Sequence, residues 1–119
     1  MKSRNFAESL RHAWRGIRHA ITHERNFKIH IFFAFAAAVF CIWFRVDGFH
    51  SFMVLYAIFS VLCMELINTA VEAIVDMYCG QKPNHFAKIA KDCCAGAVLL
   101  AAIQAVLVAV IVGQYLLTR

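Results

Sequence analysis

Three apolar segments, each long enough to cross a lipid bilayer, dominate this chain of 119 residues. Residues 29–46 are almost wholly apolar, residues 49–64 lead into a stretch with regularly spaced polar side chains, and residues 93–117 are aliphatic apart from two glutamines. A transmembrane helix needs about 20 residues, with a range of roughly 17 to 25, so all three segments qualify if the second includes its polar part. With 62% hydrophobic residues and one proline, the chain is too apolar for an ordinary soluble domain.

We therefore expect one all-α integral membrane domain over residues 1–119, with transmembrane helices at about 27–46, 49–79 and 85–117. Before the first span, at about 3–24, apolar side chains recur at helical spacing while most arginines occupy other faces. This pattern predicts an amphipathic helix that lies at the membrane surface. A soluble helix packed against a partner is the alternative interpretation.

Basic residues are concentrated before the first span and indicate the orientation of the chain. They are Lys2, Arg4, Arg11, Arg15, Arg18, Arg25 and Lys28. Only Glu8 and Glu24 oppose them, so the positive-inside rule places this end in the cytoplasm. Anionic lipid headgroups account for the net charge of +5 without nucleic acid as a partner.

Four polar residues in the second apolar segment form a stripe along one face of the predicted helix. Glu65, Asn68, Glu72 and Asp76 follow one another at offsets of three, seven and eleven residues from the first. At about 100° per residue they cover an arc of roughly 80°. Hydrogen bonding between membrane helices is one explanation, but helix association needs fewer polar residues. Since this stripe runs towards the cytoplasmic end of the helix, it predicts a site with Glu65 near lipid and Asp76 near water.

A second polar cluster is expected on the same side of the membrane. Lys91 and Asp92 open the third span, and Glu24 precedes the first. Carboxylates and a lysine at a membrane surface suit phosphoryl transfer from a nucleotide to a lipid hydroxyl, which needs divalent cations to neutralise the phosphates. Mg²⁺ prefers oxygen ligands, which Glu24 and Glu72 could supply. Glu65, which lies nearer the lipid, could accept the hydroxyl proton.

Membrane carboxylates also occur in ion-coupled transporters, so a small oligomeric transporter is an alternative function. A transporter site is expected near the bilayer midplane, whereas these residues favour one face of the membrane. Transport also gives no role to Lys91 and Asp92. The chain lacks the nucleotide-binding loops of common kinases, because neither G-x-x-x-x-G-K-[ST] nor G-x-G-x-x-G is present.

The segments HERNFKIH, ELINTAVEAIVD and AKIAKDCCAGAVLL together resemble the small bacterial membrane lipid kinases of the diacylglycerol kinase and undecaprenol kinase family. The resemblance covers nearly the whole chain, and the pattern E-x-x-N-[ST]-[AS]-x-E-x-x-x-D followed by K-D is highly specific. It implies a homotrimer with three spans per subunit, active sites shared between subunits, ATP, magnesium, and a cytoplasm-facing site in the bacterial plasma membrane. This family is unrelated to soluble kinases, which explains the missing loops.

The resemblance also implies roles for individual residues at the nucleotide end of the site. Glu24 and Glu72 match the carboxylates that hold magnesium beside ATP. Lys91 and Asp92 match a pair that contacts the nucleotide phosphates. Asp76 matches a polar residue that shapes the site, and we assign it to the nucleotide end.

At the lipid end, Glu65 matches the catalytic base of the family, and we assign Asn68 to the lipid substrate beside it. The N-F-K-I-H run and the K-D-x-x-A-G-A-V-L-L segment look more like the undecaprenol kinase branch. We therefore expect undecaprenol as the phosphate acceptor and undecaprenyl phosphate as the product. Diacylglycerol, giving phosphatidic acid, is the alternative.

Histidines receive no catalytic role in this interpretation. We expect His12, His19, His23 and His30 to be polar residues at the membrane interface. Only His23, which precedes Glu24, is expected near the candidate site.

Overall fold

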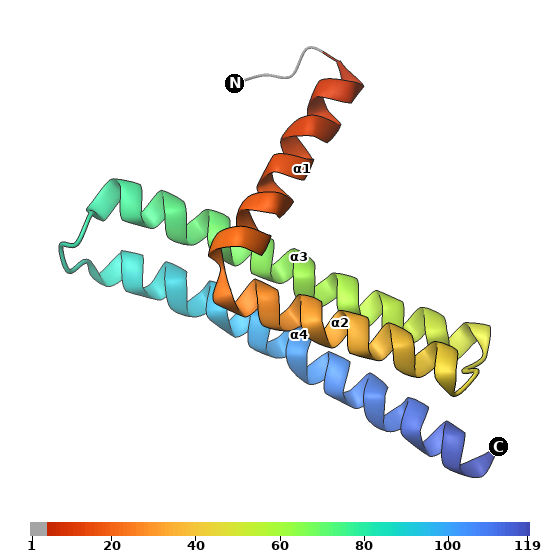
Figure 1. Cartoon of the computed structure of the whole chain (residues 1–119). Coiled ribbons are helices and arrows are strands. Elements are labelled where there is room, and N and C mark those ends of the chain that lie inside the picture. The colour runs from red at the N-terminus through yellow and green to blue at the C-terminus, as the bar shows by residue number, and fades with distance from the viewer. Residues whose placement is uncertain (1–4) are drawn as a thin grey trace.

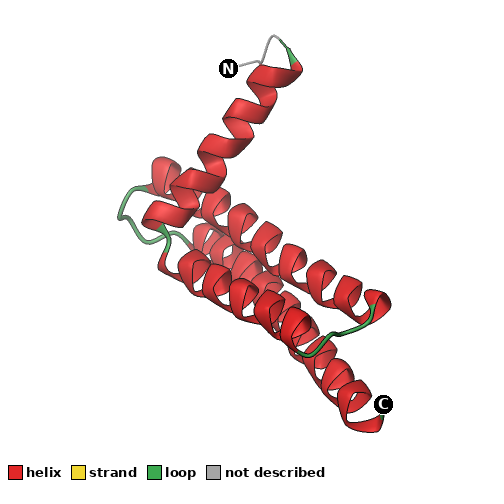
Figure 2. Ribbon diagram, turned by 45° about the vertical axis from the view of Figure 1, so that its right-hand side comes forward, coloured by secondary structure: helices red, strands yellow, loops and turns green. Residues whose placement is uncertain are grey.

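The computed structural model describes residues 5–119, which form four helices. They are α1 (Phe6–His23), α2 (Arg25–Trp43), α3 (Gly48–Cys79) and α4 (His85–Thr118). Helices α2, α3 and α4 run side by side, and α1 leaves this bundle at a steep angle (Figures 1 and 2). The last three helices are each long and apolar enough to cross a membrane, which confirms the expected all-α architecture with three candidate spans. The predicted start of the surface helix at residue 3 lies outside the described residues.

Short capping motifs set where the helices begin and end. The Asn5 side chain accepts a hydrogen bond of 2.9 Å from the Glu8 backbone N–H at the start of α1, and Asn84 accepts one of 3.0 Å from Ala87 at the start of α4. Each satisfies a backbone donor that the first helical turn leaves free. Helix α3 ends before Gly80, whose φ of 58° suits glycine because it has no Cβ.

Helix α2 differs from the expected span at both of its ends. It begins at Arg25, two residues earlier than predicted, and ends at Trp43, three residues earlier. The early end follows from the turn, because Arg45 has a φ of 49° and so leaves the right-handed helical region. Asp47 then caps α3. Because Phe44 and Val46 on either side of Arg45 are apolar, the composition does not indicate that the helix ends here.

The buried face of α3 leads directly to the first residue of the polar stripe. Ala57, Val61 and Glu65 follow at intervals of four residues, and their exposed fractions are 3%, 6% and 4%. Residues four apart share one helix face, so the carboxylate continues an otherwise apolar contact surface. Phe27 of α2 is 2% exposed and packs at the same end of the bundle as α1. A single helix face therefore serves both as the core of the bundle and as the support of Glu65.

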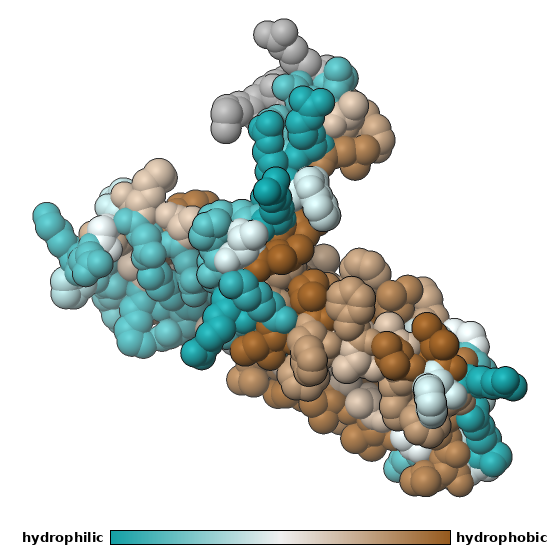
Figure 3. Space-filling view, in the orientation of Figure 1, coloured by the Kyte–Doolittle hydropathy of each residue, from teal (hydrophilic) through white to brown (hydrophobic). Residues whose placement is uncertain are grey.

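Large apolar side chains cover much of the outside of the bundle. Exposed examples on α2 are Phe32, Phe35 and Trp43. In the space-filling view, hydrophobic residues occupy the middle of the bundle, while hydrophilic residues gather on α1 and at the end that holds the α3–α4 connection (Figure 3). An apolar surface of this extent is typical of a protein embedded in lipid.

Helix lengths place the polar end of the bundle relative to the bilayer. At 1.5 Å per residue, the 19 residues of α2 are about 28 Å long, close to the hydrocarbon thickness of about 30 Å. Helices α3 and α4 have 32 and 34 residues and are therefore roughly 20 Å longer. In Figure 1 this extra length lies beyond the start of α2, at the α3–α4 connection. The stripe from Glu65 to Asp76 thus runs out of the part of the bundle that α2 covers.

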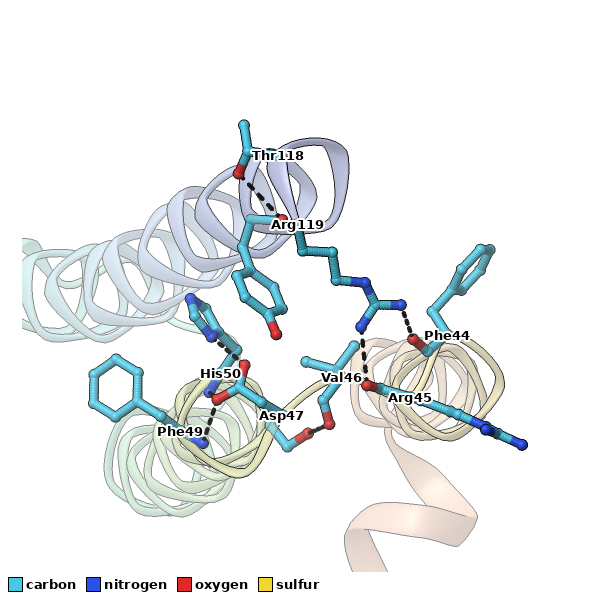
Figure 4. A network of polar contacts seen from close by, with 10 residues as sticks. Phe44, Arg45, Val46, Asp47, Phe49, His50, Thr118 and Arg119 are labelled. Carbon is cyan, nitrogen blue, oxygen red and sulfur yellow. Dashed lines mark hydrogen bonds and ion pairs between the residues drawn. The ribbon is translucent and has the colours of Figure 1, made fainter.

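A polar network closes the opposite end of the bundle (Figure 4). Asp47 accepts a hydrogen bond of 3.0 Å from the Phe49 backbone N–H and pairs with the His50 ring, which stacks on Tyr115 of α4. The Arg119 guanidinium donates to the Phe44 and Arg45 carbonyls. These contacts fasten α4 to the α2–α3 connection.

We expect the Asp47 cap to make stability depend on pH. Desolvation raises the pKa of this carboxyl, but hydrogen bonds from His50 and from the Phe49 and His50 amides outweigh it, so the pKa lies below its ordinary value of 3.8. A lowered pKa contributes stability above the ordinary value, which is lost as the pH falls through the lowered pKa. Melting temperatures in detergent from about pH 6 to about pH 2.5 should fall more steeply for the wild type than for Asp47→Asn. Parallel curves would contradict this role of the carboxylate.

Candidate active site

Glu65 is the most buried charged residue in the described part of the chain. Its exposed fraction is 4%, and its Oε1 atom lies 3.2 Å from Nε2 of His30 on α2. Burying a carboxylate is costly unless it is paired or hydrogen-bonded, and within residues 5–119 this histidine is the one side chain that does so. His30 comes five residues after the start of α2, so the pair lies roughly 7 Å below the first residue of that helix. The position agrees with a site just inside the apolar layer.

The next two stripe residues contact each other one and two turns beyond Glu65. Asn68 Nδ2 donates a hydrogen bond of 3.2 Å to Oε1 of Glu72, and both side chains are half-buried. The other end of the amide, Oδ1 of Asn68, is buried and has no hydrogen-bond partner among the described residues. An unsatisfied buried acceptor costs about 1 to 3 kcal/mol. A donor from a bound molecule can satisfy this atom.

The outer end of the stripe is joined to α4. Lys91 Nζ lies 2.5 Å from Oδ1 of Asp76, and the two side chains are 40% and 62% exposed. Since the Glu65 side chain is only 5% exposed, solvent access rises along the stripe towards Asp76. Eleven residues separate the two acids, which is about 16 Å along the helix. The stripe therefore connects a buried end at Glu65 with a solvent-exposed end at Asp76.

Lys91 and Asp92 do not contact each other. The lysine pairs with Asp76 across the two helices, whereas Asp92 pairs with Lys88 one turn earlier on α4, at 2.5 Å. Lys91 and Asp92, which are predicted to contact phosphate, therefore each have a different partner. Lys88 and Asp92 are 75% and 64% exposed, so water screens their attraction.

Glu24 stands between α1 and α2, where the chain changes direction. Its backbone N–H donates to the Ala20 carbonyl at 2.9 Å, and its carbonyl accepts from the Lys28 amide at 3.2 Å. The side chain is half-buried, and no described contact joins it to Glu72. The described residues contain no cluster of three acidic, histidine or cysteine side chains close enough to form a metal cage. Glu24 and Glu72 are therefore two separate carboxylates on different elements.

The donor set is compatible with magnesium bound together with a nucleotide. Mg²⁺ usually takes one or two protein carboxylates and completes its shell with water and substrate phosphates. Glu72 is a half-buried carboxylate already oriented by the Asn68 amide, and Lys91 is a nearby cation that could contact phosphate. Glu24 can join this set only if a ligand bridges the distance to Glu72.

His30 is a contact that the sequence interpretation missed. His23 is the only histidine that the sequence predicts near the candidate site, and this is wrong because His30 contacts Glu65. His23 instead stacks on His19 and hydrogen-bonds Thr22 on α1. A usable signal was present, because His30 follows the buried Phe27 by three residues and therefore lies on the same face of α2.

An apolar groove of about 600 Å³ also lies between α2, α3 and α4. Small and branched side chains line it, including Ala37, Cys41, Ala57, Ala105 and Val112. His30, the Glu65 partner, lines the same groove. The carboxylate is thus separated from an apolar groove by one imidazole ring.

Comparisons with known proteins show what the chain is similar to. The family model for prokaryotic diacylglycerol kinase matches residues 11–113. A diacylglycerol kinase of Synechocystis sp. is 42% identical over 87% of this chain, and the match spans 59% of that protein's length. A diacylglycerol kinase of Escherichia coli is 31% identical over 81% of this chain and 78% of its own. An undecaprenol kinase of Bacillus subtilis is 35% identical over 90% of this chain and 86% of its own.

Proposed function

The chain belongs to the prokaryotic diacylglycerol kinase family, and we propose that it is a membrane lipid kinase that transfers the γ-phosphate of ATP to a lipid hydroxyl. The observation that best supports this activity is the graded stripe on α3. It begins at a buried carboxylate on the stretch of α3 that α2 covers and ends at an exposed acid paired with a lysine. A reaction between a lipid and a water-soluble nucleotide needs both environments within one site.

Proton transfer is assigned to the buried end of the stripe. As the lipid hydroxyl oxygen bonds to the γ-phosphorus, the bond from that phosphorus to the bridging oxygen breaks and ADP leaves. Glu65 accepts the hydroxyl proton, which is the role of a general base. Its burial supports this assignment, because the acceptor hydroxyl must also approach from the apolar layer. Asn68, one turn further along α3, is assigned to the lipid substrate beside Glu65.

Nucleotide binding is assigned to the exposed end. Glu24 and Glu72 would hold Mg²⁺, which when bound neutralises phosphate charge during the transfer. Lys91 and Asp92 contact the phosphates. Asp76 forms an ion pair with Lys91 and so orients the lysine. The Asp76–Lys91 pair also holds α3 against α4 where the two helices project beyond α2. We further propose a homotrimer in the bacterial plasma membrane, with each site completed by a neighbouring subunit and open to the cytoplasm.

Undecaprenol is the acceptor that we propose first. Its support lies in the N-F-K-I-H and K-D-x-x-A-G-A-V-L-L segments and in the similarity to the Bacillus subtilis undecaprenol kinase. Diacylglycerol is the second candidate, because the Synechocystis relative, at 42% identity, is named a diacylglycerol kinase. Both lipids present a hydroxyl at the membrane interface, so the same chemistry serves either.

A direct assay separates these acceptors. Purified protein in mixed micelles receives γ-labelled ATP, Mg²⁺ and either undecaprenol or diacylglycerol at matched surface concentration. We expect label in both lipids, with kcat/KM at least about tenfold higher for undecaprenol, a difference of about 1.4 kcal/mol in transition-state stabilisation. A higher value for diacylglycerol would reverse the assignment, and no label in either lipid would overturn the proposed activity.

A further inference from the structure

His30 and Glu65 form the one polar contact between α2 and α3 that lies inside the apolar layer of the described chain. The histidine follows Phe27, which is 2% exposed, by three residues and so shares its face of α2. Its side chain is 25% exposed, against 5% for Glu65. An ordinary helix contact would be made more cheaply by two apolar residues, because pairing in a dry interior must offset the desolvation of both groups.

We propose that His30 is a positioning residue for the phosphoryl transfer assigned above, which orients the Glu65 carboxylate towards the acceptor hydroxyl. Nε2 of His30 and Oε1 of Glu65 lie 3.2 Å apart as an ion pair. An ionised carboxylate accepts hydrogen bonds and donates none, so this contact attracts Glu65 only when Nε2 carries a proton. This N–H fixes Oε1 and leaves Oε2 to receive the hydroxyl proton. His30 keeps its own proton throughout, and the transferred proton ends on Glu65.

The groove beside the ring strengthens this role. Ala37, Ala57 and Ala105 line it with small side chains, and His30 forms part of the same wall. A hydrogen bond is electrostatically stronger where the local dielectric is low. Because the ring both lines the groove and contacts the carboxylate, any change in its shape or donor should alter the orientation of Glu65. It should have little effect on the nucleotide end, which begins one to two turns further along α3.

Two substitutions separate the hydrogen bond from the packing of the ring. His30→Leu removes the donor, whereas His30→Gln keeps an amide N–H at a similar reach to Nε2. Misplacement of a catalytic group by about 1 Å can cost about 10²-fold, so we expect kcat to fall about 10²-fold in the leucine variant, with KM for ATP unchanged within about twofold. The glutamine variant should recover most of this loss. His19→Leu on exposed α1 is the matched control and should keep the wild-type kcat.

Two kinetic results would overturn the proposal: equal kcat values in the leucine and glutamine variants, or a loss confined to KM for ATP. A spectroscopic measurement decides it independently of activity. In wild-type protein labelled with ¹⁵N-histidine, the His30 signals should report an Nε2–H tautomer, and Glu65→Leu should shift them while leaving those of His50 unchanged. Unshifted His30 signals would refute the contact. If the wild type phosphorylated neither lipid, the proposed activity would fail, yet this measurement would still decide whether His30 donates to Glu65.

Discussion

Glu65→Gln should abolish phosphoryl transfer while the protein continues to bind nucleotide. The substitution keeps the size of the side chain and an oxygen that can face His30, but it removes the group that takes the hydroxyl proton. General-base catalysis contributes about 10²- to 10⁴-fold, so kcat should fall by at least about 10²-fold. Binding of a non-hydrolysable ATP analogue, measured by calorimetry with Mg²⁺, should stay within about threefold of wild type, since Glu65 lies at the lipid end.

Glu8→Gln provides the matched control, because it makes the same change on α1, away from the stripe. Surface substitutions usually alter free energies by no more than about 0.5 kcal/mol, so its kcat should stay within about twofold of wild type. Retention of more than about a tenth of the wild-type kcat by Glu65→Gln would contradict a general-base role. In that case Glu65 would serve chiefly to join α3 to α2 through His30.

Much of the fold could be predicted because its signals are local in sequence. Apolar length predicts the three spans, and helical spacing predicts the polar stripe of α3 that begins at Glu65. The early end of α2 was not predictable from composition, since apolar residues continue on both sides of Arg45, where the backbone already turns. The turn is decided by the Asp47 cap and by the contacts of Arg119, which lies far along the chain.

The candidate site was less predictable, because its contacts depend on how the helices are rotated about their axes. Turning α2 by one residue, about 100°, would carry His30 away from Glu65 without changing the hydrophobicity of the helix. The partner of Lys91 was equally open. Its long flexible side chain stands next to Asp92 in sequence, but the packing of α4 on α3 brings it to Asp76. Sequence spacing thus identified the polar residues of the site but did not determine their partners.

Glu72→Gln should have the opposite effect from Glu65→Gln, with its main loss in nucleotide binding. The variant keeps an acceptor for the Asn68 amide but loses the negative charge assigned to Mg²⁺. Hydrogen bonds and contacts to charged groups are worth about 1.5 to 3 kcal/mol, which predicts a decrease of about 10- to 100-fold in affinity for the magnesium complex of the ATP analogue. Titrations with the analogue at several Mg²⁺ concentrations measure this change, and excess Mg²⁺ should recover part of the affinity.

Glu72→Asp separates charge from reach, because it keeps the carboxylate on a side chain one methylene shorter. If the negative charge binds the metal, Glu72→Asp should lose less affinity than Glu72→Gln, and the loss should depend less on Mg²⁺ concentration. The decisive comparison is between the two stripe positions. If Glu65→Gln and Glu72→Gln weakened nucleotide binding equally, the rise in solvent exposure along α3 would have no functional counterpart. A loss confined to Glu72→Gln would instead assign the metal to the outer half of the stripe and leave the buried end for the lipid.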